Sequence, residues 1–457
     1  MLKNISNIYF LGICGIGMSA LARWTNFKKF NIKGWDDDIK SPLIEPLKQE
    51  GIEIHNQVDD PNFISFVTSI QEDNTILVYT SAISKKHPVL QLFNSQNINS
   101  YKRADLLQYI SEEYQVVAVA GTHGKTTISI MLSHILKHSG VDCNAFFGGI
   151  SKDYRTNLMV GDSSIMVIEA DEYDKSFLKL NPDISLVSSM DKDHGDIYET
   201  HQDLLNEYGK FILSTKKIVI GHSSLTNKFD FTYALDAGSD FYASDIERHE
   251  TSFYFTINFP DNRRVKTKLS FGSTYNIENA VAAASLAFQL GISPKNIGAA
   301  LMIFQGVSRR FEYYYVNKSK SIIIDDYAHH PEELRSLITS IRMIHKQKKI
   351  FLIFQPHLFS RTQEFERQFA EVLSLVDKLI LIDIYPARET RIKGVSSARL
   401  LKKVNLQSKW HVSGNFDQIE FNYLFKKIFL ENKPELVVTA GAGSVCNLIP
   451  KLQRLLA

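Results

Sequence analysis

The sequence is poor in the features that mark a disulfide-linked, membrane-bound or nucleic-acid-binding protein. Its 457 residues include only three cysteines, Cys14, Cys143 and Cys446, which lie far apart and show no metal-binding spacing. This usage excludes a disulfide framework and indicates a reducing compartment, so we expect a cytoplasmic protein. The net charge of +2 at pH 7 gives no electrostatic reason to expect nucleic acid or an anionic membrane as a partner.

Long apolar runs are also missing. Residues 8–22 carry no charge and could be mistaken for the apolar region of a signal peptide. They contain three glycines, which weaken a helix, and the run is too short to span a bilayer. We interpret this stretch as a strand followed by a glycine turn. No other run approaches the required length, so we predict no membrane insertion.

What the sequence does contain is typical of a large globular protein. Hydrophobic residues make up 44% of the chain and charged residues 22%. A chain of this length exceeds what one hydrophobic core serves, so we expect two to four domains. Aliphatic and β-branched runs alternate with helical patterns, which predicts an α/β fold with doubly wound parallel sheets.

The clearest motif spans Val116–Thr127. A β-branched run enters a glycine loop, and an apolar-periodic helix follows. In this context backbone N–H groups and the helix N-terminus bind phosphate, Lys125 reaches the β- and γ-phosphates, and the Thr126 hydroxyl contacts Mg²⁺. Val119 stands where the standard motif has glycine, so this is a shortened variant in which Gly121 makes the turn. The alternative is a strand–helix turn that binds no ligand.

Two acidic strand ends follow this loop. The apolar run from Ser164 ends in Glu169, Asp171 and Glu172, where a Mg²⁺ ligand is expected. Glu169 is the best candidate, and its two neighbours would orient it or hold metal-bound water. A second strand leads into residues 193–196, where His194 lies between acids. His194 would ligate a second Mg²⁺ or contact the transferred phosphoryl group, and solvated loop charges are the alternative.

The N-terminal strand leads into Gly12, Gly15 and Gly17, a relative of the dinucleotide-binding fingerprint. Asp36 ends the next strand, about 20 residues further on, where such folds hydrogen-bond a ribose or base. A glycine turn without a ligand stays open as the alternative. A nicotinamide oxidoreductase would need a paired catalytic His or Lys in this half, and none is seen. The pattern therefore favours a nucleotide that is bound for recognition and does not itself react.

Polar clusters continue through the rest of the chain. Residues 228–269 alternate polar and apolar types, which predicts a small antiparallel sheet beside the main one. Asn276 and Asn279 open an alanine-rich helix, where they would cap it or meet a purine edge. Arg309 and Arg310 suit oxyanions, with a solvated basic pair as the alternative. The strand ending at residues 325–331 belongs to a third doubly wound domain.

Taken together, these motifs resemble the Mur ligase family across essentially the whole chain. The resemblance is carried by Gly121–Thr127, Glu169–Glu172, Asn276 with Asn279, Arg309-Arg310 and Asp325–Pro331. It implies a three-domain α/β architecture. A Rossmann-like UDP-sugar-binding domain would cover residues 1–110, a central P-loop ATPase with the small antiparallel sheet 111–315, and a Rossmann-like domain 316–457.

The resemblance also implies an activity, namely ATP- and Mg²⁺-dependent amide formation through an acyl phosphate in peptidoglycan precursor synthesis. Gly15–Ala20, Asp193-His194, and Gln355–His357 with Ser360–Thr362 favour UDP-N-acetylmuramic acid and L-alanine as substrates. A family member that adds a whole tripeptide is the alternative. A regulatory P-loop ATPase would need no acceptor, and the polar residues at 325–331 and 355–362 argue against it.

The same resemblance implies roles for single residues. Asn279 would meet adenine, Arg310 the phosphates and Asp326 the ribose. The residues implied to hold ATP are Gly121, Thr122, His123, Gly124, Lys125, Thr126, Thr127, Asn279, Arg310 and Asp326. Those implied to hold UDP-N-acetylmuramic acid or L-alanine are Gly12, Gly15, Ile16, Gly17, Asp36, Ser81, His357 and Arg361. The implied Mg²⁺ ligands are Thr126, Glu169 and His194. The implied catalytic residues are Lys125, His194, Arg310, His330 and Arg361.

Two positions depart from the family pattern. Cys14 stands where the family usually has glycine, which narrows the room for a backbone–phosphate approach. Ser444 stands where aspartate usually follows the final glycines. Neither change removes a residue needed for phosphoryl transfer.

Overall fold

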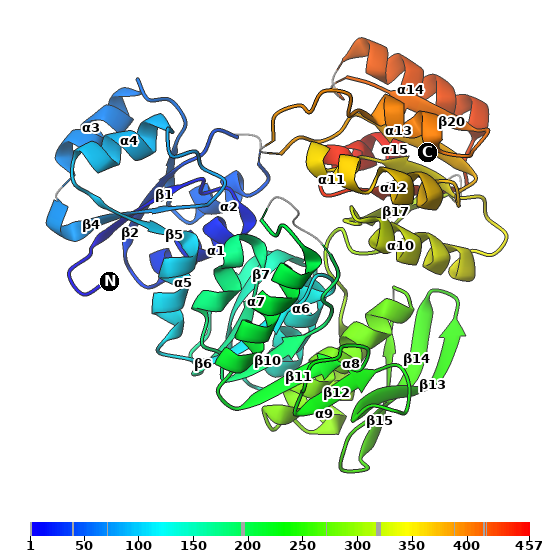
Figure 1. Ribbon diagram of the computed structural model, residues 1–457, viewed down its shortest axis with the longest axis horizontal. Helices are drawn as coiled ribbons and strands as arrows, with labels where there is room; N and C mark the ends of the chain where they lie inside the picture. Colours follow the sequence, from blue (N-terminus) through cyan, green and yellow to red (C-terminus); the bar gives the residue numbers. More distant parts are fainter. Residues whose placement is uncertain are drawn as a thin grey trace.

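The computed structural model describes residues 2–38, 41–70, 72–192, 197–270, 272–316, 321–387, 389–414, 416 and 418–457. Its strands form three sheets of five, ten and six strands. The N-terminal sheet (blue) and the C-terminal sheet (yellow-green to red) lie on either side of the central domain in Figure 1. Within the described ranges, none of the helices combines the length and apolar character needed to cross a bilayer.

The N-terminal domain is a parallel sheet of order β3-β2-β1-β4-β5. β1 ends at Leu11, and the turn through Gly12 leads into α1, which confirms the predicted strand and glycine turn. The strands are β1 (Asn7–Leu11), β2 (Asn31–Trp35), β3 (Glu53–His55), β4 (Thr75–Tyr79) and β5 (Asn99–Lys102). The helices are α1 (Ile16–Phe27), α2 (Ile44–Gln49), α3 (Pro61–Ser69), α4 (Pro88–Ser95) and α5 (Arg103–Ser111).

The central domain holds the ten-stranded sheet, of order β15-β14-β13-β12-β11-β10-β6-β9-β7-β8. Its strands are β6 (Gln115–Ala120), β7 (Asn144–Ser151), β8 (Thr156–Met159), β9 (Ile165–Glu169), β10 (Ile184–Val187), β11 (Ile218–His222), β12 (Phe231–Ala234), β13 (Phe241–His249), β14 (Ser252–Asn258) and β15 (Arg264–Leu269). Its helices are α6 (Lys125–His138), the 3₁₀ segment η2 (Tyr173–Lys179), α7 (His201–Ser214), α8 (Thr274–Gln289) and α9 (Pro294–Ile303).

The predicted antiparallel strands are present, but they do not form a sheet of their own. β13, β14 and β15 are antiparallel to one another, as the alternation predicts. However, β13 also pairs in parallel with β12, so these strands extend the main sheet. The sequence pattern reports which faces are buried, but it carries no information on which neighbour an edge strand joins.

The C-terminal domain has the strand order β16-β17-β21-β18-β19-β20, with β16 antiparallel and the others parallel. β16 spans the predicted domain limit between residues 315 and 316, and the limits themselves stay predictions. The strands are β16 (Glu312–Val316), β17 (Ser321–Asp326), β18 (Phe351–Phe354), β19 (Lys378–Ile382), β20 (Lys409–Val412) and β21 (Leu436–Ala440). The helices are α10 (Pro331–Ile344), α11 (Phe359–Glu364), α12 (Glu366–Leu373), α13 (Ser397–Lys403), α14 (Ile419–Asn432) and α15 (Ile449–Leu456).

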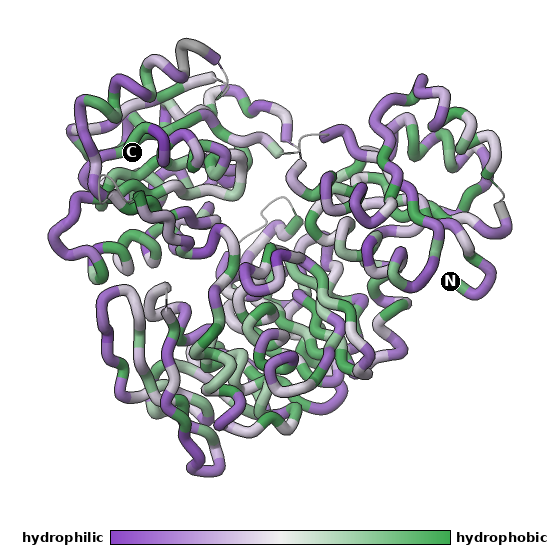
Figure 2. The backbone as a smooth tube through the Cα atoms, turned by 180° about the vertical axis from the view of Figure 1, so that it is seen from behind, coloured by the Kyte–Doolittle hydropathy of each residue, from purple (hydrophilic) through white to green (hydrophobic). Residues whose placement is uncertain are grey.

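Strand β6, which leads into the phosphate loop, faces two hydrophobic cores. Val117 and Val119 belong to a core that extends through α6 and α8 to the C-terminal domain. Val116, Ala118 and Ala120 belong to a second core that is continuous with the N-terminal domain. Successive strand residues point to opposite faces, so both faces of this strand are buried. Figure 2 shows hydrophobic segments concentrated inside the domains.

Helix α1 belongs to the N-terminal domain but also packs on the central sheet, against β7 and β8. Asn157 on β8 is 1% exposed. Its amide donates to the Ile16 carbonyl over 2.6 Å and to Ser19 Oγ over 2.9 Å. These buried hydrogen bonds fix the start of α1 against the central domain.

We predict that Asn157→Leu lowers the free energy of unfolding by roughly 2 kcal/mol, because it removes the buried hydrogen bonds that join β8 to the start of α1. Thermal unfolding should show a lower Tm. Asn296→Ala, at an exposed position on α9, is the matched control and should leave the Tm within about 1 °C of wild type. Equal shifts for the two variants would contradict the role assigned to Asn157.

Candidate active site

The loop between β6 and α6 has the shape of a phosphate-binding loop. Gly121 has φ +130° and Gly124, the N-cap of α6, has φ +83°, conformations that L side chains rarely adopt. A Cβ on Gly121 would collide with Ser188, and one on Gly124 would lie 2.7 Å from Asn279 Oδ1. Both glycines are therefore required, and Asn279 packs directly against the loop.

Lys125, the first residue of α6, is held by a carboxylate. Its ammonium donates to the Gly121 carbonyl over 2.6 Å and to Glu172 Oε2 over 2.8 Å. Burial lowers the pKa of Lys125, but the charges of Glu172 and Asp171 outweigh burial and raise the pKa above its ordinary value. The structure thus pairs Glu172 with the loop lysine, a role that the sequence analysis did not foresee.

Thr126 and Glu169 provide an oxygen pair suited to Mg²⁺. The Thr126 hydroxyl donates to Glu169 Oε1 over 2.8 Å, and Glu169 Oε2 accepts from the Gly148 N–H over 2.6 Å. Mg²⁺ typically takes one or two protein oxygens and completes its shell with water and substrate phosphates. The two residues therefore fit this ion, although the described residues contain no group of three His, Cys, Asp or Glu side chains that would hold a metal without other ligands. His194 lies outside the described residues.

A cavity of about 290 Å³ lies between the central and C-terminal domains. It brings the predicted ATP-binding residues Asn279, Arg310 and Asp326 together with four residues of the phosphate loop, although they are far apart in sequence. The loop residues that line it are His123, Gly124, Thr126 and Thr127. Other lining residues, which the sequence analysis did not single out, are His222, Tyr233, Tyr275, Glu278 and Glu333.

Arg310 is presented to this cavity by a strained turn. Its neighbours Arg309 and Phe311 have φ +60° and +52°, in the left-handed region. Asp326 holds the turn, because its carboxylate accepts from the Phe311 N–H over 2.7 Å and from the Ala328 N–H over 2.8 Å. Burial raises the pKa of Asp326 to about 6, against the opposing effect of Arg310. Asp326 therefore positions Arg310 as well as lining the cavity.

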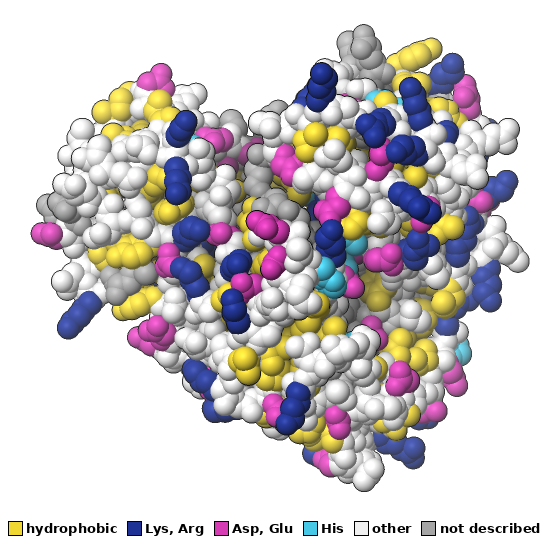
Figure 3. All heavy atoms as spheres, in the orientation of Figure 1, with side chains coloured by type: hydrophobic (Ala, Val, Ile, Leu, Met, Phe, Trp, Pro, Cys, Tyr) yellow, Lys and Arg dark blue, Asp and Glu magenta, His cyan; other side chains and the backbone are white. Residues whose placement is uncertain are grey.

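A contact between His123 and Glu333 joins the phosphate loop to the C-terminal domain. His123 Nδ1 lies 3.1 Å from Glu333 Oε1, while Glu333 Oε2 accepts from the His329 and His330 N–H groups. Burial lowers the pKa of His123, but Glu333 outweighs it and the net pKa is raised. Burial raises the pKa of Glu333, but His329, His123 and Arg310 lower it well below its ordinary value. Figure 3 shows histidine side chains gathered near the hollow where the domains meet.

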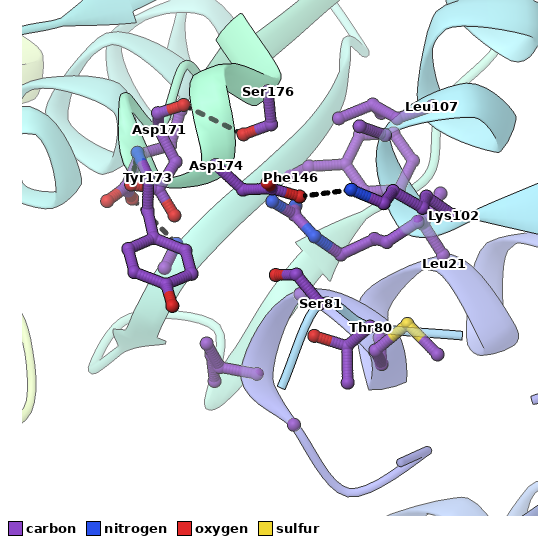
Figure 4. Close-up of a pocket in the computed structure, with 18 of the residues that line it drawn as sticks. Leu21, Thr80, Ser81, Lys102, Leu107, Phe146, Asp171, Tyr173, Asp174 and Ser176 are labelled. Atoms are coloured by element: carbon purple, nitrogen blue, oxygen red, sulfur yellow. Dashed lines mark hydrogen bonds and ion pairs between the residues drawn. The ribbon is translucent and has the colours of Figure 1, made fainter. Parts of the chain in front are cut away.

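A second cavity, of about 300 Å³, lies between the N-terminal and central domains. It is lined by the predicted residues Gly15, Ile16, Gly17 and Ser81. Figure 4 shows Ser81 and Thr80 below Lys102 and Asp174 in this cavity. Glu169 also lines it, whereas Thr126 lines the other cavity. The Thr126–Glu169 hydrogen bond therefore lies at the junction of the two cavities.

The remaining predicted residues lie outside the two cavities. Asp36 caps the turn after β1, since its carboxylate accepts from the Cys14 N–H over 2.7 Å. His357 and Arg361 lie together in the C-terminal domain, with Arg361 Nη1 3.5 Å from His357 Nδ1 and the His329 ring 5.8 Å from the His357 ring. His330 is the buried N-cap of α10. Their roles stay predictions.

The two departures from the family pattern have local partners. Burial raises the pKa of the Cys14 thiol to about 12, so the thiol is protonated at neutral pH. Ser444 begins a 3₁₀ turn, where its hydroxyl contacts the Gln355 amide over 3.3 Å.

Comparison with known proteins decides the family. Three family profiles match in succession: "Mur ligase family, catalytic domain" over residues 7–115, "Mur ligase middle domain" over 119–287, and "Mur ligase, glutamate ligase domain" over 309–443. The chain belongs to the Mur ligase family. The three matched segments of this Mur ligase follow its three sheets.

Curated relatives cover the Mur ligase from end to end. A UDP-N-acetylmuramate–L-alanine ligase of Christiangramia forsetii is 38% identical over 100% of this chain and 98% of its own length. A protein of the same name from Porphyromonas gingivalis is 39% identical over 97% of this chain and 98% of its own length.

Solved structures share the fold at lower sequence identity. A UDP-N-acetylmuramate-alanine ligase from Thermotoga maritima superimposes with a TM-score of 0.79 at 23% identity, covering 98% of this chain and 99% of that one. A murein peptide ligase from Psychrobacter arcticus gives a TM-score of 0.71 at 21% identity, covering 98% of each chain.

The His123–Glu333 contact gives a pH prediction. Both groups are charged above the lowered pKa of Glu333 and below the raised pKa of His123, so the contact weakens as pH rises through the latter. We expect Glu333→Gln to lower the His123 pKa, measured by NMR titration of the imidazole. Glu332→Gln, with its more exposed side chain beside Glu333, should leave it unchanged. An unchanged His123 pKa in Glu333→Gln would contradict the pairing.

Proposed function

We propose that this Mur ligase joins L-alanine to the carboxylate of UDP-N-acetylmuramic acid in the cytoplasm, at the expense of ATP and through an acyl phosphate. The observation that carries the proposal is the meeting of two cavities at Thr126 and Glu169. Full-length relatives of the same name, 38 and 39% identical, support the choice of substrates.

Each cavity suits one of the two large substrates. The cavity with the phosphate loop, Asn279 and Arg310 suits ATP. The cavity between the N-terminal and central domains suits the sugar nucleotide, whose carboxylate would then face the junction. A carboxylate oxygen that attacks the γ-phosphorus releases ADP and forms the mixed anhydride. The amine nitrogen of L-alanine then attacks the carbonyl carbon, the C–O bond to phosphate breaks, and the leaving phosphate takes up the proton that the nitrogen loses.

The reaction brings several negative charges close together, and the described residues include groups that would neutralise them. Lys125, held at the phosphate loop, and Arg310, which lines the cavity beside that loop, are cations that would offset charge on the phosphates. Thr126 and Glu169 would hold Mg²⁺, which supplies further neutralisation of phosphate oxygens when bound.

The acceptor step is mainly a positioning task. L-Alanine reacts as a neutral amine, held in line with the acyl carbon and away from water. His357 and Arg361 lie on the C-terminal domain next to His329. We assign to them the carboxylates of L-alanine and the muramoyl group, because guanidinium and imidazole N–H groups donate hydrogen bonds to carboxylate oxygens.

The test is phosphate release by the purified protein with ATP and Mg²⁺. UDP-N-acetylmuramic acid and L-alanine are added singly and together, and L-alanyl-D-glutamyl-diaminopimelate serves as the rival acceptor. We expect release only with the sugar nucleotide and L-alanine together. Release with the tripeptide but not L-alanine would indicate the tripeptide ligase, and release without any sugar nucleotide would contradict the ligase proposal.

Lys125→Ala should lower the rate of phosphate release by at least about 100-fold, because it removes a preorganised cation at the phosphates. Lys137→Ala, on the same helix but with a side chain 48% exposed, is the matched control and should keep the wild-type rate. Comparable losses in both variants would mean that damage to α6, rather than loss of the phosphate contact, lowers activity.

A further inference from the structure

The cavity between the N-terminal and central domains has cations on one of its walls. The N-terminal wall contains Gly15–Gly17, Thr80–Ala82 and the start of α5. The facing wall comes from the central domain and includes Phe146–Gly148 and Tyr173–Asp174. Two adjacent cations, Lys102 and Arg103, lie where β5 passes into α5. The two side chains differ in the acidic groups that lie next to them.

The charge of Lys102 is already compensated. Its ammonium lies 2.8 Å from Asp174 Oδ2, and Figure 4 shows the two side chains reaching toward each other across the cavity. Asp174 has φ +53°, a conformation outside the usual range of a non-glycine residue. A substrate anion would have to compete with Asp174 for this ammonium.

The charge of Arg103 is not compensated by a neighbouring acid. Among the described residues, none has a carboxylate within 4.0 Å of its guanidinium, and none accepts a hydrogen bond from it. The side chain is half-buried and packs against the first turn of α1, where a Cβ on Gly17 would lie 3.1 Å from Nη1. A partly desolvated guanidinium with five N–H donors and no anion is a binding group for a ligand oxyanion.

Nearby acids are engaged elsewhere. Asp105 pairs with Lys179 and accepts from the Lys102 N–H. Glu169 accepts from Thr126 and Gly148, and Asp171 accepts from the Tyr173 N–H. Each of these carboxylates has its own donor, so Arg103 remains available on the cavity wall.

We propose that Arg103 binds an oxyanion of the sugar nucleotide, either its diphosphate or its muramoyl carboxylate. This inference rests on the proposed function, which supplies the ligand. Both groups accept the paired N–H donors of a guanidinium. Arg103 is then a binding residue of the reaction, and Lys102 is a structural residue that closes the wall with Asp174.

The experiment is equilibrium binding by calorimetry to the full chain. UDP-N-acetylmuramic acid and UDP-N-acetylglucosamine, which lacks the carboxylate, are the two ligands. The variants are Arg103→Gln, Arg103→Lys and the double variant Lys102→Gln/Asp174→Asn, which removes the neighbouring ion pair without changing net charge. We expect Arg103→Gln to raise the Kd for UDP-N-acetylmuramic acid by about tenfold or more. Arg103→Lys should restore part of this loss, and the double variant should stay within about twofold of wild type.

The two ligands separate the two anions. Weaker binding of both by Arg103→Gln assigns Arg103 to the diphosphate, and weaker binding of UDP-N-acetylmuramic acid alone assigns it to the carboxylate. Unchanged binding by Arg103→Gln, or an equal loss in the double variant, overturns the assignment of Arg103. Failure of the wild-type chain to bind UDP-N-acetylmuramic acid would instead overturn the proposed function, and a matching Tm for all variants excludes misfolding.

Discussion

The pairing of buried charges before any substrate arrives is the constraint on which this active site depends. The proposed phosphoryl transfer brings two polyanions, ATP and the sugar nucleotide, close together, so cations must be buried near the phosphates, and burial of an isolated charge is costly. The Glu172 carboxylate offsets the cost of burying the Lys125 charge, and the charges of Asp326 and Glu333 offset the cost of burying Arg310. These acids keep the cations charged and fixed. They also explain why so many carboxylates line a site for anionic ligands.

The same pairing connects the domains. Glu333 lies on the C-terminal domain, and its partner His123 lies in the phosphate loop. Asp326 ends β17 and holds the turn that presents Arg310. The N-terminal domain is instead joined to the central sheet through buried contacts of α1, including those of Asn157. The cavity beside the phosphate loop therefore has polar walls contributed by two domains, whereas the cavity between the N-terminal and central domains lies beside a shared apolar core.

Several residues that the sequence predicts to act together lie together in the structure, whereas most of the contacts between them were not predicted. Local patterns located Lys125, Thr126 and Glu169, because strand, loop and helix signals surround them. Asn279 and Arg310 were assigned through a family resemblance, and the fold brings both to one cavity. Three contacts could not be predicted: the pairs of Lys125 with Glu172 and of His123 with Glu333, and the junction of β13 with β12. Each depends on tertiary geometry that residue spacing does not encode. The sequence does carry one signal for Glu333, because it lies three residues after the N-cap His330, where an acidic residue completes a capping box. That signal concerns the start of α10 and not the contact with His123.

Helix α1 has a consequence for the synthesis of the chain. It ends at Phe27, but the strands that cover its outer side end only at Met159. A nascent N-terminal domain therefore displays an uncovered apolar face of α1 until more than a hundred further residues have left the ribosome. Its final packing must wait for the central sheet, so this domain cannot complete its folding first. During that interval the uncovered face is exposed hydrophobic surface of the kind that chaperones bind.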